Sequence, residues 1–319
     1  MSDFLKELNK KYGDNTMIKV GDQEIPKIKM KRTGITSFDL ALGGGFGEGR
    51  IIELFGMESS GKTTLSLLAI AEEQKLGHKC AFIDVEQALD FEYAAFLGVN
   101  IPELYVTQPD SAEDALEILD RSIESGLFSI IVLDSVAALA PKAELEGEMG
   151  DQKMAVVARL MSQATRKITA KTKKTNTTVI FINQLRAMIG AYVPMNVTTG
   201  GNALKFASSQ RVEVSKGTQI KSGDDILGYL MKIKVVKNKL FPPFKKAEVD
   251  NIFGVGIDRF KDSISVAVDK GIIQKSGSWY SYDGVKLGQG LDKAKDLIAD
   301  NPEMMEEITE KLIKATTRA

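Results

Sequence analysis

Residues 51–64 read Ile-Ile-Glu-Leu-Phe-Gly-Met-Glu-Ser-Ser-Gly-Lys-Thr-Thr, an apolar run followed by a glycine-containing loop. The apolar run predicts a buried strand, and the Gly-x-x-x-x-Gly-Lys-Thr pattern that begins at Gly56 opens a helical segment. Strand, loop and helix are the context in which the phosphate-binding loop of nucleoside triphosphatases occurs. Backbone N–H groups of such a loop surround an anion, and the positive end of the helix dipole points at the same place. The stretch therefore predicts a nucleoside triphosphate site rather than a chance glycine turn.

Lys62 and Thr63 carry the chemistry of this loop. The ammonium group of Lys62 is expected to reach the terminal phosphates, and the hydroxyl group of Thr63 is expected to ligate magnesium. The residues of the loop that we assign to the nucleotide are Gly56, Glu58, Ser59, Ser60, Gly61, Lys62, Thr63 and Thr64.

The composition is that of an ordinary soluble globular protein. With 319 residues, 43% of them hydrophobic and 27% charged, the chain is long enough for one large α/β domain and a smaller one. The net charge of −1 means that any DNA-binding surface has to be local. One cysteine, Cys80, and one histidine exclude a disulfide framework and a Cys/His metal cluster, so a reducing, cytoplasmic location is expected. Neither a secretory signal nor a transmembrane run is present in the sequence, so no membrane partner is expected.

Between residues 33 and 204, short apolar runs alternate with helical patterns. This alternation predicts an α/β fold, a parallel-sheet P-loop core wrapped by helices. After Leu204 the pattern changes toward strands, which are predicted over 211–214, 229–236 and 247–253. The predicted domains are an N-terminal helix and strand over 1–31, an ATPase core over 32–257, and a small α/β C-terminal domain over 258–319.

The N-terminal segment over residues 2–13 reads as an amphipathic helix with Phe4, Leu5 and Leu8 on its apolar face. Such a face can pack on its own chain or on a neighbouring molecule. The pattern alone slightly favours its own chain.

Two carboxylates follow apolar strands that neighbour the phosphate loop. Asp134 ends one such strand, where it can hold a magnesium-bound water, although an aspartate there can also simply cap a helix. Glu86 ends another and is placed to orient a water molecule in line with the terminal phosphate. Asp84 and Asp90 compete for that second role, and spacing alone does not decide among the three.

Gln184 ends a third strand and leads into the glycine-containing segment 185–199. A neutral amide at this edge can touch the terminal phosphate and transmit the nucleotide state to that segment, as in an order–disorder switch. A simple strand cap is the alternative, and without further context it would be the preferred reading.

With these motifs together, the chain resembles the RecA family of homologous recombinases from about residue 32 to 290. A generic P-loop protein would share only the phosphate loop and the segment that begins at Asp134. The matching motifs are Gly56-Met57-Glu58-Ser59-Ser60-Gly61-Lys62-Thr63-Thr64, Ala81-Phe82-Ile83-Asp84-Val85-Glu86, Asp134-Ser135-Val136-Ala137-Ala138-Leu139, Phe181-Ile182-Asn183-Gln184, Thr199-Gly200-Gly201-Asn202-Ala203-Leu204-Lys205-Phe206 and Lys234-Val235-Val236-Lys237-Asn238-Lys239.

The resemblance implies roles at the nucleotide, with ATP and Mg²⁺ as cofactors. Glu86 matches the family's catalytic glutamate, and Gln184 matches its nucleotide-sensing glutamine. Asp90 and Tyr93 match positions that hold the adenine ring. A further match is a pair of lysines that reach the ATP of the adjacent subunit, Lys237 and Lys239, which alone would read as a solvated strand face.

The resemblance also implies two DNA-binding loops, over roughly 146–154 and 186–199. Cations and backbone amides would bind phosphates there, and apolar wedges would separate bases. The implied DNA contacts are Met154 as a wedge, Arg159, Arg166 and Arg186 near the DNA backbone, and the amides of Gly200, Gly201 and Asn202. Family proteins dock their N-terminal helix on the next subunit, which overturns the preference stated above, and Phe206 matches a position at that interface.

Some positions depart from the family pattern. Gln87 and Phe91 replace the usual His and Pro. The second loop is one residue shorter, which leaves its wedge residue open between Tyr192 and Val193. An acidic C-terminal tail is also missing from the sequence, so easier loading on duplex DNA or a lower magnesium demand is expected.

The resemblance thus implies an ATP-dependent DNA recombinase that forms a helical homo-oligomeric filament on single-stranded DNA. It would pair that strand with a homologous duplex and exchange strands in recombination, repair and the response to DNA damage. Loading or mediator proteins and a single-strand binding protein are the further partners it implies. A ring-forming helicase or packaging motor is one alternative, which the motifs around 184 and 199–206 disfavour. A nucleotide-gated scaffold is another, and Glu86, Lys237 and Lys239 argue against it.

Overall fold

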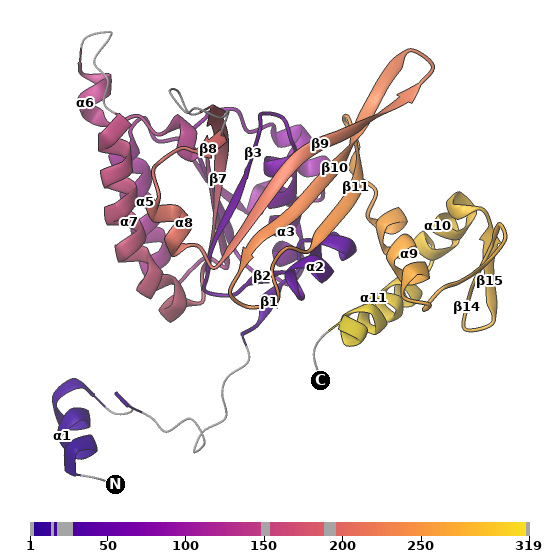
Figure 1. Cartoon of the computed structure of the whole chain (residues 1–319), viewed down its shortest axis with the longest axis horizontal. Helices are drawn as coiled ribbons and strands as arrows, with labels where there is room; N and C mark the ends of the chain where they lie inside the picture. The colour runs from indigo at the N-terminus through magenta and orange to yellow at the C-terminus, as the bar shows by residue number, and fades with distance from the viewer. Residues whose placement is uncertain (1–2, 14–15, 18–27, 148–153, 188–195, 317–319) are drawn as a thin grey trace.

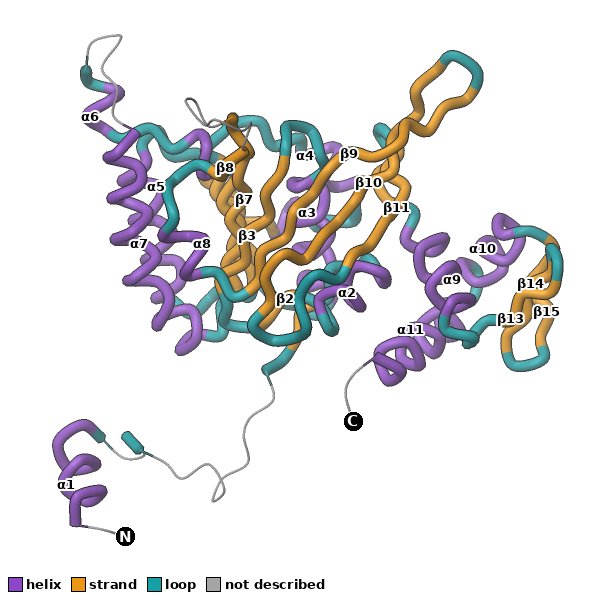
Figure 2. The backbone as a smooth tube through the Cα atoms, in the orientation of Figure 1, coloured by secondary structure: helices purple, strands orange, loops and turns teal. Residues whose placement is uncertain are grey.

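The computed structural model describes residues 3–13, 16–17, 28–147, 154–187 and 196–316 (Figure 1). A large sheet runs through the middle of the main body, helices cover both of its faces, and a smaller unit at the C-terminal end lies beside it (Figure 2). Within the described residues, no helix is both long and apolar enough to cross a bilayer.

The large sheet has the strand order β12-β11-β10-β9-β3-β7-β6-β4-β5, with β8 paired to β7. Neighbours from β9 to β5 along this path run parallel, whereas the pairs from β9 to β12 are antiparallel. The strands are β3 (Ile51–Gly56), β4 (Cys80–Asp84), β5 (Leu104–Thr107), β6 (Ile130–Asp134), β7 (Thr178–Ala187), β8 (Asn196–Thr198), β9 (Gln210–Ser222), β10 (Asp225–Asn238), β11 (Lys246–Ile252) and β12 (Gly256–Ile257). The mostly parallel α/β sheet predicted from the sequence is confirmed.

Strand β3 lies at the centre of this sheet and is buried on both faces. Its successive side chains point to opposite faces, so Ile52 and Leu54 pack with Leu65 of the following helix, and Ile51 packs with Ile168 on the other side. The helices of the main body are α2 (Thr36–Leu42), α3 (Lys62–Lys75), α4 (Phe91–Phe96), α5 (Ala112–Glu124), α6 (Lys142–Leu145), α7 (Met154–Thr175) and α8 (Ala203–Ala207). Short 3₁₀ turns, η2 (Ile101–Glu103) and η3 (Val136–Ala138), and a small sheet of β1 (Met30–Lys31) and β2 (Phe46–Gly47) complete it.

The helix α3 is buried around most of its circumference rather than on one face alone, because it lies inside one of the two cores of the main body. It begins after Gly61, whose φ is 91°, and Gly77 follows its end with a φ of 78°. Both glycines adopt the left-handed backbone that marks the ends of this helix.

The strands β9 and β10 extend well beyond the predicted ranges and form a long hairpin that projects from the sheet (Figure 1). Residues 215–227 are mostly polar or exposed, so they lack the apolar alternation by which a half-buried strand is recognised.

The C-terminal unit has its own small core. It consists of α9 (Arg259–Asp269), β13 (Gln274–Ser276), β14 (Trp279–Tyr282), β15 (Val285–Gln289), α10 (Leu291–Ala299) and α11 (Pro302–Thr316). The unit contacts α2, where the backbone N–H of Ser37 donates to Asp262 at 2.9 Å. The domain boundaries at 31/32 and 257/258 stay predictions.

The N-terminal helix α1 (Asp3–Tyr12) has no buried residue and lies apart from the sheet (Figure 1). Phe4 is 60% exposed and Tyr12 is 64% exposed. The preference drawn from the pattern alone, that this helix packs on its own chain, is therefore not what the structure shows.

Replacing a buried leucine of α3 tests whether this helix holds the main body together. We expect Leu68→Ala to lower the free energy of unfolding by about 2–5 kcal/mol, because Leu68 is 1% exposed and the change leaves a cavity. Urea unfolding followed by far-ultraviolet circular dichroism measures it. Leu76→Ala, next to the same helix but 69% exposed, is the matched control and should cost less than about 1 kcal/mol. Equal losses in the two variants would contradict the assignment.

Candidate active site

The two glycines of the phosphate-loop pattern are required for different reasons, Gly56 by close packing on backbone and Gly61 by its left-handed φ of 91°. A Cβ atom on Gly56 would lie 2.0 Å from the carbonyl oxygen of Val214, and one on Gly61 would lie 2.1 Å from Cε of Met231. Between them, Ser59 adopts a left-handed backbone with φ of 51°. The loop therefore takes a conformation that the neighbouring strands β9 and β10 leave little freedom to change.

The side chain of Lys62 is folded onto this loop. Its Nζ atom donates to the carbonyl oxygen of Met57 at 2.8 Å and to that of Gly56 at 3.3 Å. Burial lowers the pKa of Lys62, while the negative charges of Asp134 and Glu86 oppose that shift. A positive charge is thus held beside the backbone amides that would bind an anion.

Thr63 and Asp134 meet where α3 begins and β6 ends. The hydroxyl group of Thr63 donates to Oδ2 of Asp134 at 2.7 Å. Burial raises the pKa of Asp134 to about 7, and the Thr63 hydrogen bond opposes the shift. Oxygen donors of this kind suit Mg²⁺, which binds through one or two protein groups and the phosphates of a nucleotide. Across the described part of the chain, no cluster of three or more His, Cys, Asp or Glu is arranged to hold a metal.

Glu86 and Ser135 follow the ends of β4 and β6, and Gln184 meets them from within β7, which continues three residues past the predicted end at Gln184. Oε1 of Glu86 accepts a hydrogen bond from Nε2 of Gln184 at 2.9 Å and another from the hydroxyl group of Ser135. The carboxyl ends of β4, β6 and β7 lie side by side at one edge of the sheet, which is why these side chains meet. Ser135 was not singled out from the sequence, although it follows Asp134 directly.

The two competing carboxylates have structural partners of their own. Asp84 is buried and accepts hydrogen bonds from the backbone of Ala88 and Leu89 and from the side chain of Gln108. Asp90 caps α4 by accepting from the N–H group of Tyr93. This leaves Glu86 as an exposed carboxylate whose partners are side chains rather than backbone amides.

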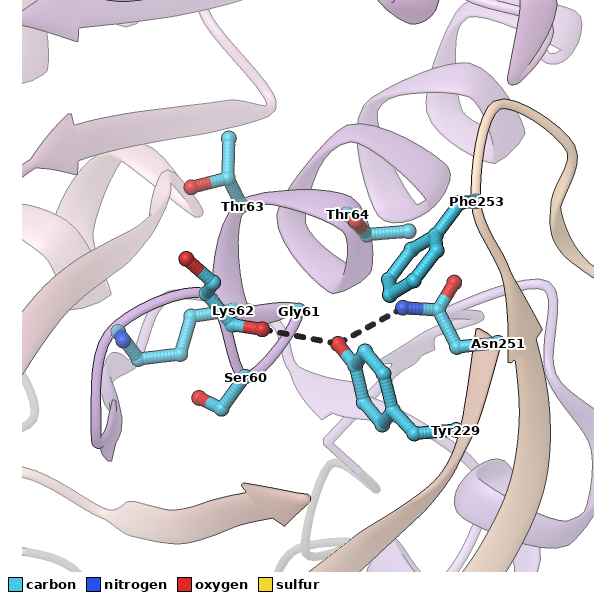
Figure 3. Close-up of a pocket in the computed structure, with 9 residues that line it drawn as sticks. Ser60, Gly61, Lys62, Thr63, Thr64, Tyr229, Asn251 and Phe253 are labelled. Carbon is cyan, nitrogen blue, oxygen red and sulfur yellow. Dashed lines mark hydrogen bonds between the residues drawn. The ribbon is translucent and has the colours of Figure 1, made fainter. Parts of the chain in front are cut away.

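Tyr93 and Asp90 lie on the side of α3 that faces Glu86. They line a cavity of about 210 Å³ together with Thr63, Glu86 and Asp134. The hydroxyl group of Tyr93 lies 3.2 Å from that of Thr64. A second cavity of about 260 Å³ flanks the other side of the loop and is lined by Tyr229, Asn251 and Phe253, which the sequence did not point to (Figure 3).

A buried polar network ties this region to the sheet. Nδ2 of Asn183 donates to Glu53 at 2.9 Å and to the carbonyl oxygen of Thr199 at 3.1 Å. Oδ1 of Asn183 accepts from the hydroxyl group of Thr199 at 2.6 Å and from the N–H group of Gln184 at 2.9 Å. The carboxylate of Glu53 also accepts from Arg211. The network was missed from the sequence because its members lie in four separate segments.

The structure does not bring the two implied trans-acting lysines to the phosphate loop of their own chain. Nζ of Lys237 donates to the backbone carbonyl groups of Lys205 at 2.6 Å and Phe206 at 3.1 Å, at the end of β10 remote from the loop. Burial, followed by the charges of Lys239 and Arg211, lowers the pKa of Lys237. The side chain of Lys239 is exposed nearby.

The implied DNA contacts fall into two groups. Arg159 and Arg166 on α7 and Arg186 at the end of β7 are exposed. Gly200 and Gly201 have φ of 75° and 77° and pack against η3 and α7 just before α8, whose N-cap is Asn202. Most of the first loop, residues 148–153, and the two wedge candidates of the second, Tyr192 and Val193, lie outside the described residues, as does the side chain of Met154.

Comparison with known proteins covers almost the whole chain. A family described as "RecA N-terminal domain" matches residues 1–258, and one described as "RecA C-terminal domain" matches residues 262–317. "Protein RecA" of Desulforapulum autotrophicum is 52% identical over 311 residues, which are 97% of this chain and 90% of that protein. "Protein RecA" of Bacteroides thetaiotaomicron is 51% identical over 316 residues, 98% of this chain and 96% of that protein. The crystal structure of the RadB recombinase is similar in fold, with a TM-score of 0.55 and 23% identity over 72% of this chain and 98% of that one.

Asn183→Leu tests the buried network. We expect it to lower the free energy of unfolding by about 1–3 kcal/mol, because buried partners on Glu53 and Thr199 lose their donor or acceptor. Chemical denaturation measures this loss. Asn202→Leu, at an exposed position without a side-chain capping hydrogen bond, is the control and should change stability by less than about 0.5 kcal/mol. A loss no larger than the control's would mean that the network contributes nothing to stability.

Proposed function

The chain belongs to the RecA family, and from that premise we propose that Glu86, Gln184 and the phosphate loop form half of an ATPase site that the next subunit completes. The protein is an ATP-dependent DNA recombinase, a DNA-dependent ATPase with strand-exchange activity. The observation that best supports the proposed site is the hydrogen bond from Gln184 to Glu86, beside the contact between Thr63 and Asp134. These two contacts bring together three parts of the proposed site at one edge of the sheet: a carboxylate that would activate water, an amide that would sense phosphate and a pair that would bind the metal.

The loop amides and Lys62 bind the phosphates of ATP in this proposal. Thr63 and Asp134 would hold Mg²⁺, which when bound neutralises charge on the phosphate oxygens. Glu86 orients the attacking water molecule and accepts its proton. Asp90 and Tyr93 hold the adenine ring in the cavity that they line together with Thr63 and Glu86. Charge–charge contacts and positioning thus supply the catalysis, as phosphoryl transfer requires.

Gln184 reports the state of the nucleotide. Its amide nitrogen donates to Glu86, and its backbone N–H donates to Asn183, which also binds Thr199 at the end of the second DNA loop. A terminal phosphate would compete with Glu86 for the amide. A change of partner at Gln184 would then act on residues 185–199.

DNA contacts are proposed for the exposed arginines and the amides before α8. Arg159, Arg166 and Arg186 neutralise phosphates, the amides of Gly200, Gly201 and Asn202 donate to them, and Met154 is the wedge of the first loop. The exposed apolar face of α1 docks on the next subunit of a helical filament, and Phe206, 75% exposed, lies at the same kind of interface. Loading or mediator proteins, a single-strand binding protein and a cytoplasmic location complete the proposal.

Glu86→Gln tests the catalytic assignment. The amide cannot accept a proton, so we expect the rate of ATP hydrolysis on single-stranded DNA to fall at least about 100-fold while ATP still binds. Phosphate release and calorimetric nucleotide binding measure the two quantities. Glu92→Gln, an exposed neighbour on α4, is the control and should hydrolyse ATP at the parental rate. A parental rate in Glu86→Gln would remove the assignment.

Mixing two inactive variants tests whether the site is shared between subunits. Lys237→Ala and Glu86→Gln are each expected to be inactive, yet in an equal mixture about a quarter of head-to-tail interfaces carry both native residues. We therefore expect the mixture to regain about a quarter of the parental DNA-dependent ATPase rate. Glu86→Gln mixed with Lys62→Ala is the matched control, because both changes lie on the same half and no interface is repaired. No recovery in the first mixture, or equal recovery in both, would argue against completion by the next subunit.

A further inference from the structure

The cavity of about 260 Å³ beside the phosphate loop is closed by residues that are distant from the loop in sequence. Tyr229 comes from β10, Asn251 from β11 and Phe253 from the turn after β11 (Figure 3). The side chains of Tyr229 and Asn251 point at the loop, and both residues are buried. The roles proposed above use none of these three residues.

Tyr229 makes a direct hydrogen bond to the loop. Its hydroxyl group donates to the carbonyl oxygen of Ser59 at 3.0 Å and accepts from Nδ2 of Asn251 at 2.9 Å (Figure 3). A phenol has one proton to donate, and the donation from Asn251 leaves that proton for Ser59. The loop carbonyl is thus bound to a side chain that is itself fixed by a second strand.

The hydrogen bond from Tyr229 acts on a residue, Ser59, whose backbone conformation needs to be held by its surroundings. Its φ of 51° lies in the left-handed region, which costs a non-glycine residue free energy unless its surroundings hold it there. The peptide unit between Ser59 and Ser60 is planar and trans, so its C=O and N–H groups point in opposite directions. Fixing the Ser59 carbonyl therefore also fixes the direction of the Ser60 N–H group, one of the amides of the loop.

A second contact from the same strand supports the loop two residues on. The methyl group of Met231 packs so closely on Gly61 that a Cβ atom there would lie 2.1 Å from it. Tyr229 and Met231 are two residues apart in β10 and project from the same face of the sheet. One strand thus holds the loop by a hydrogen bond at Ser59 and by packing at Gly61.

We infer that Tyr229 is a positioning residue for the nucleotide site, whose hydroxyl group sets the affinity for nucleotide phosphates by holding the Ser59–Ser60 peptide unit in its binding orientation. The inference rests on the proposed function, because it takes the loop as the phosphate site. The contact acts on a loop that binds phosphate before and during hydrolysis alike. Its loss therefore weakens nucleotide binding without slowing the chemical step.

Tyr229→Phe in the full-length protein removes the hydroxyl group and keeps the ring. Titration calorimetry with ADP and Mg²⁺, without DNA, should give a Kd about 2- to 10-fold higher than the parental value, the loss expected for one hydrogen bond. KM for ATP on single-stranded DNA should rise by a similar factor, with kcat within about 2-fold of the parental value. Tyr280→Phe, which changes a buried tyrosine of the C-terminal unit, is the matched control and should bind ADP with the parental Kd.

A double variant separates positioning from mere stability. In Tyr229→Phe the amide of Asn251 loses its partner, and that loss alone could lower the melting temperature. Tyr229→Phe combined with Asn251→Leu removes the unpaired amide, so the melting temperature should recover while the Kd for ADP stays raised. Recovery of both, or a Kd in Tyr229→Phe equal to that of Tyr280→Phe, would overturn the inference. Lys62→Ala reports on the underlying proposal separately, because undiminished ADP binding in that variant would mean that the loop is not the phosphate site.

Discussion

A fully buried carboxylate in the central strand constrains the arrangement of the whole site. Glu53 lies in β3, the strand that carries the phosphate loop, and its side chain has no contact with solvent. A charge in such a position is tolerated only with partners, and removal of a partner is costly. Arg211 of β9 supplies one and Asn183 of β7 supplies the other, so the strands on either side of β3 are tied to it by polar contacts as well as by their ladders. The residues that follow these strands are consequently held in register with the loop.

The strand β10 links the phosphate loop to the opposite end of the strands of this sheet. Tyr229 contacts the phosphate loop of its own chain, and Lys237 lies eight residues further along, about 26 Å away in an extended strand. Strand β9 pairs with β10 along this stretch, with register shifts at Tyr229/Met231 and Val235/Lys237, and β11 pairs with it on the other side as far as Lys234. If Lys237 reaches the ATP of the adjacent subunit, as proposed, a single strand contacts two successive nucleotides. A displacement of β10 at one nucleotide would then also change its contact with the other nucleotide.

The sequence was sufficient to predict the fold wherever a local pattern of apolar residues marks a strand or a helix. The apolar strands ending at Glu86 and Asp134 predicted the parallel sheet, which is confirmed, and placed both carboxylates at its edge. Local patterns were insufficient where partners are distant, as with the contact of Tyr229 to Ser59, because antiparallel pairing after Leu204 cannot be read from periodicity. The long β9–β10 hairpin was underestimated because its outer part is polar on both faces. Lys237 had no signal of its own apart from the family resemblance, and its role, like those of the other site residues, stays a prediction.

The proposed coupling between nucleotide and DNA can rest on the side-chain amide of Gln184, which would have two competing acceptors. Its nitrogen now donates to Glu86, and a phosphate oxygen at the loop would be an alternative acceptor. Coupling requires an element with two arrangements that both sites bias, and a side chain with two competing acceptors is such an element. Two contacts reach the end of the segment that is proposed to bind DNA: Asn183 binds Thr199, and Gly200 packs against Val136, the residue after Ser135. A Cβ atom at Gly200 would lie 2.7 Å from the side chain of Val136, so the two segments are in close contact and a displacement of the Ser135 segment would press on the segment that begins at Thr199.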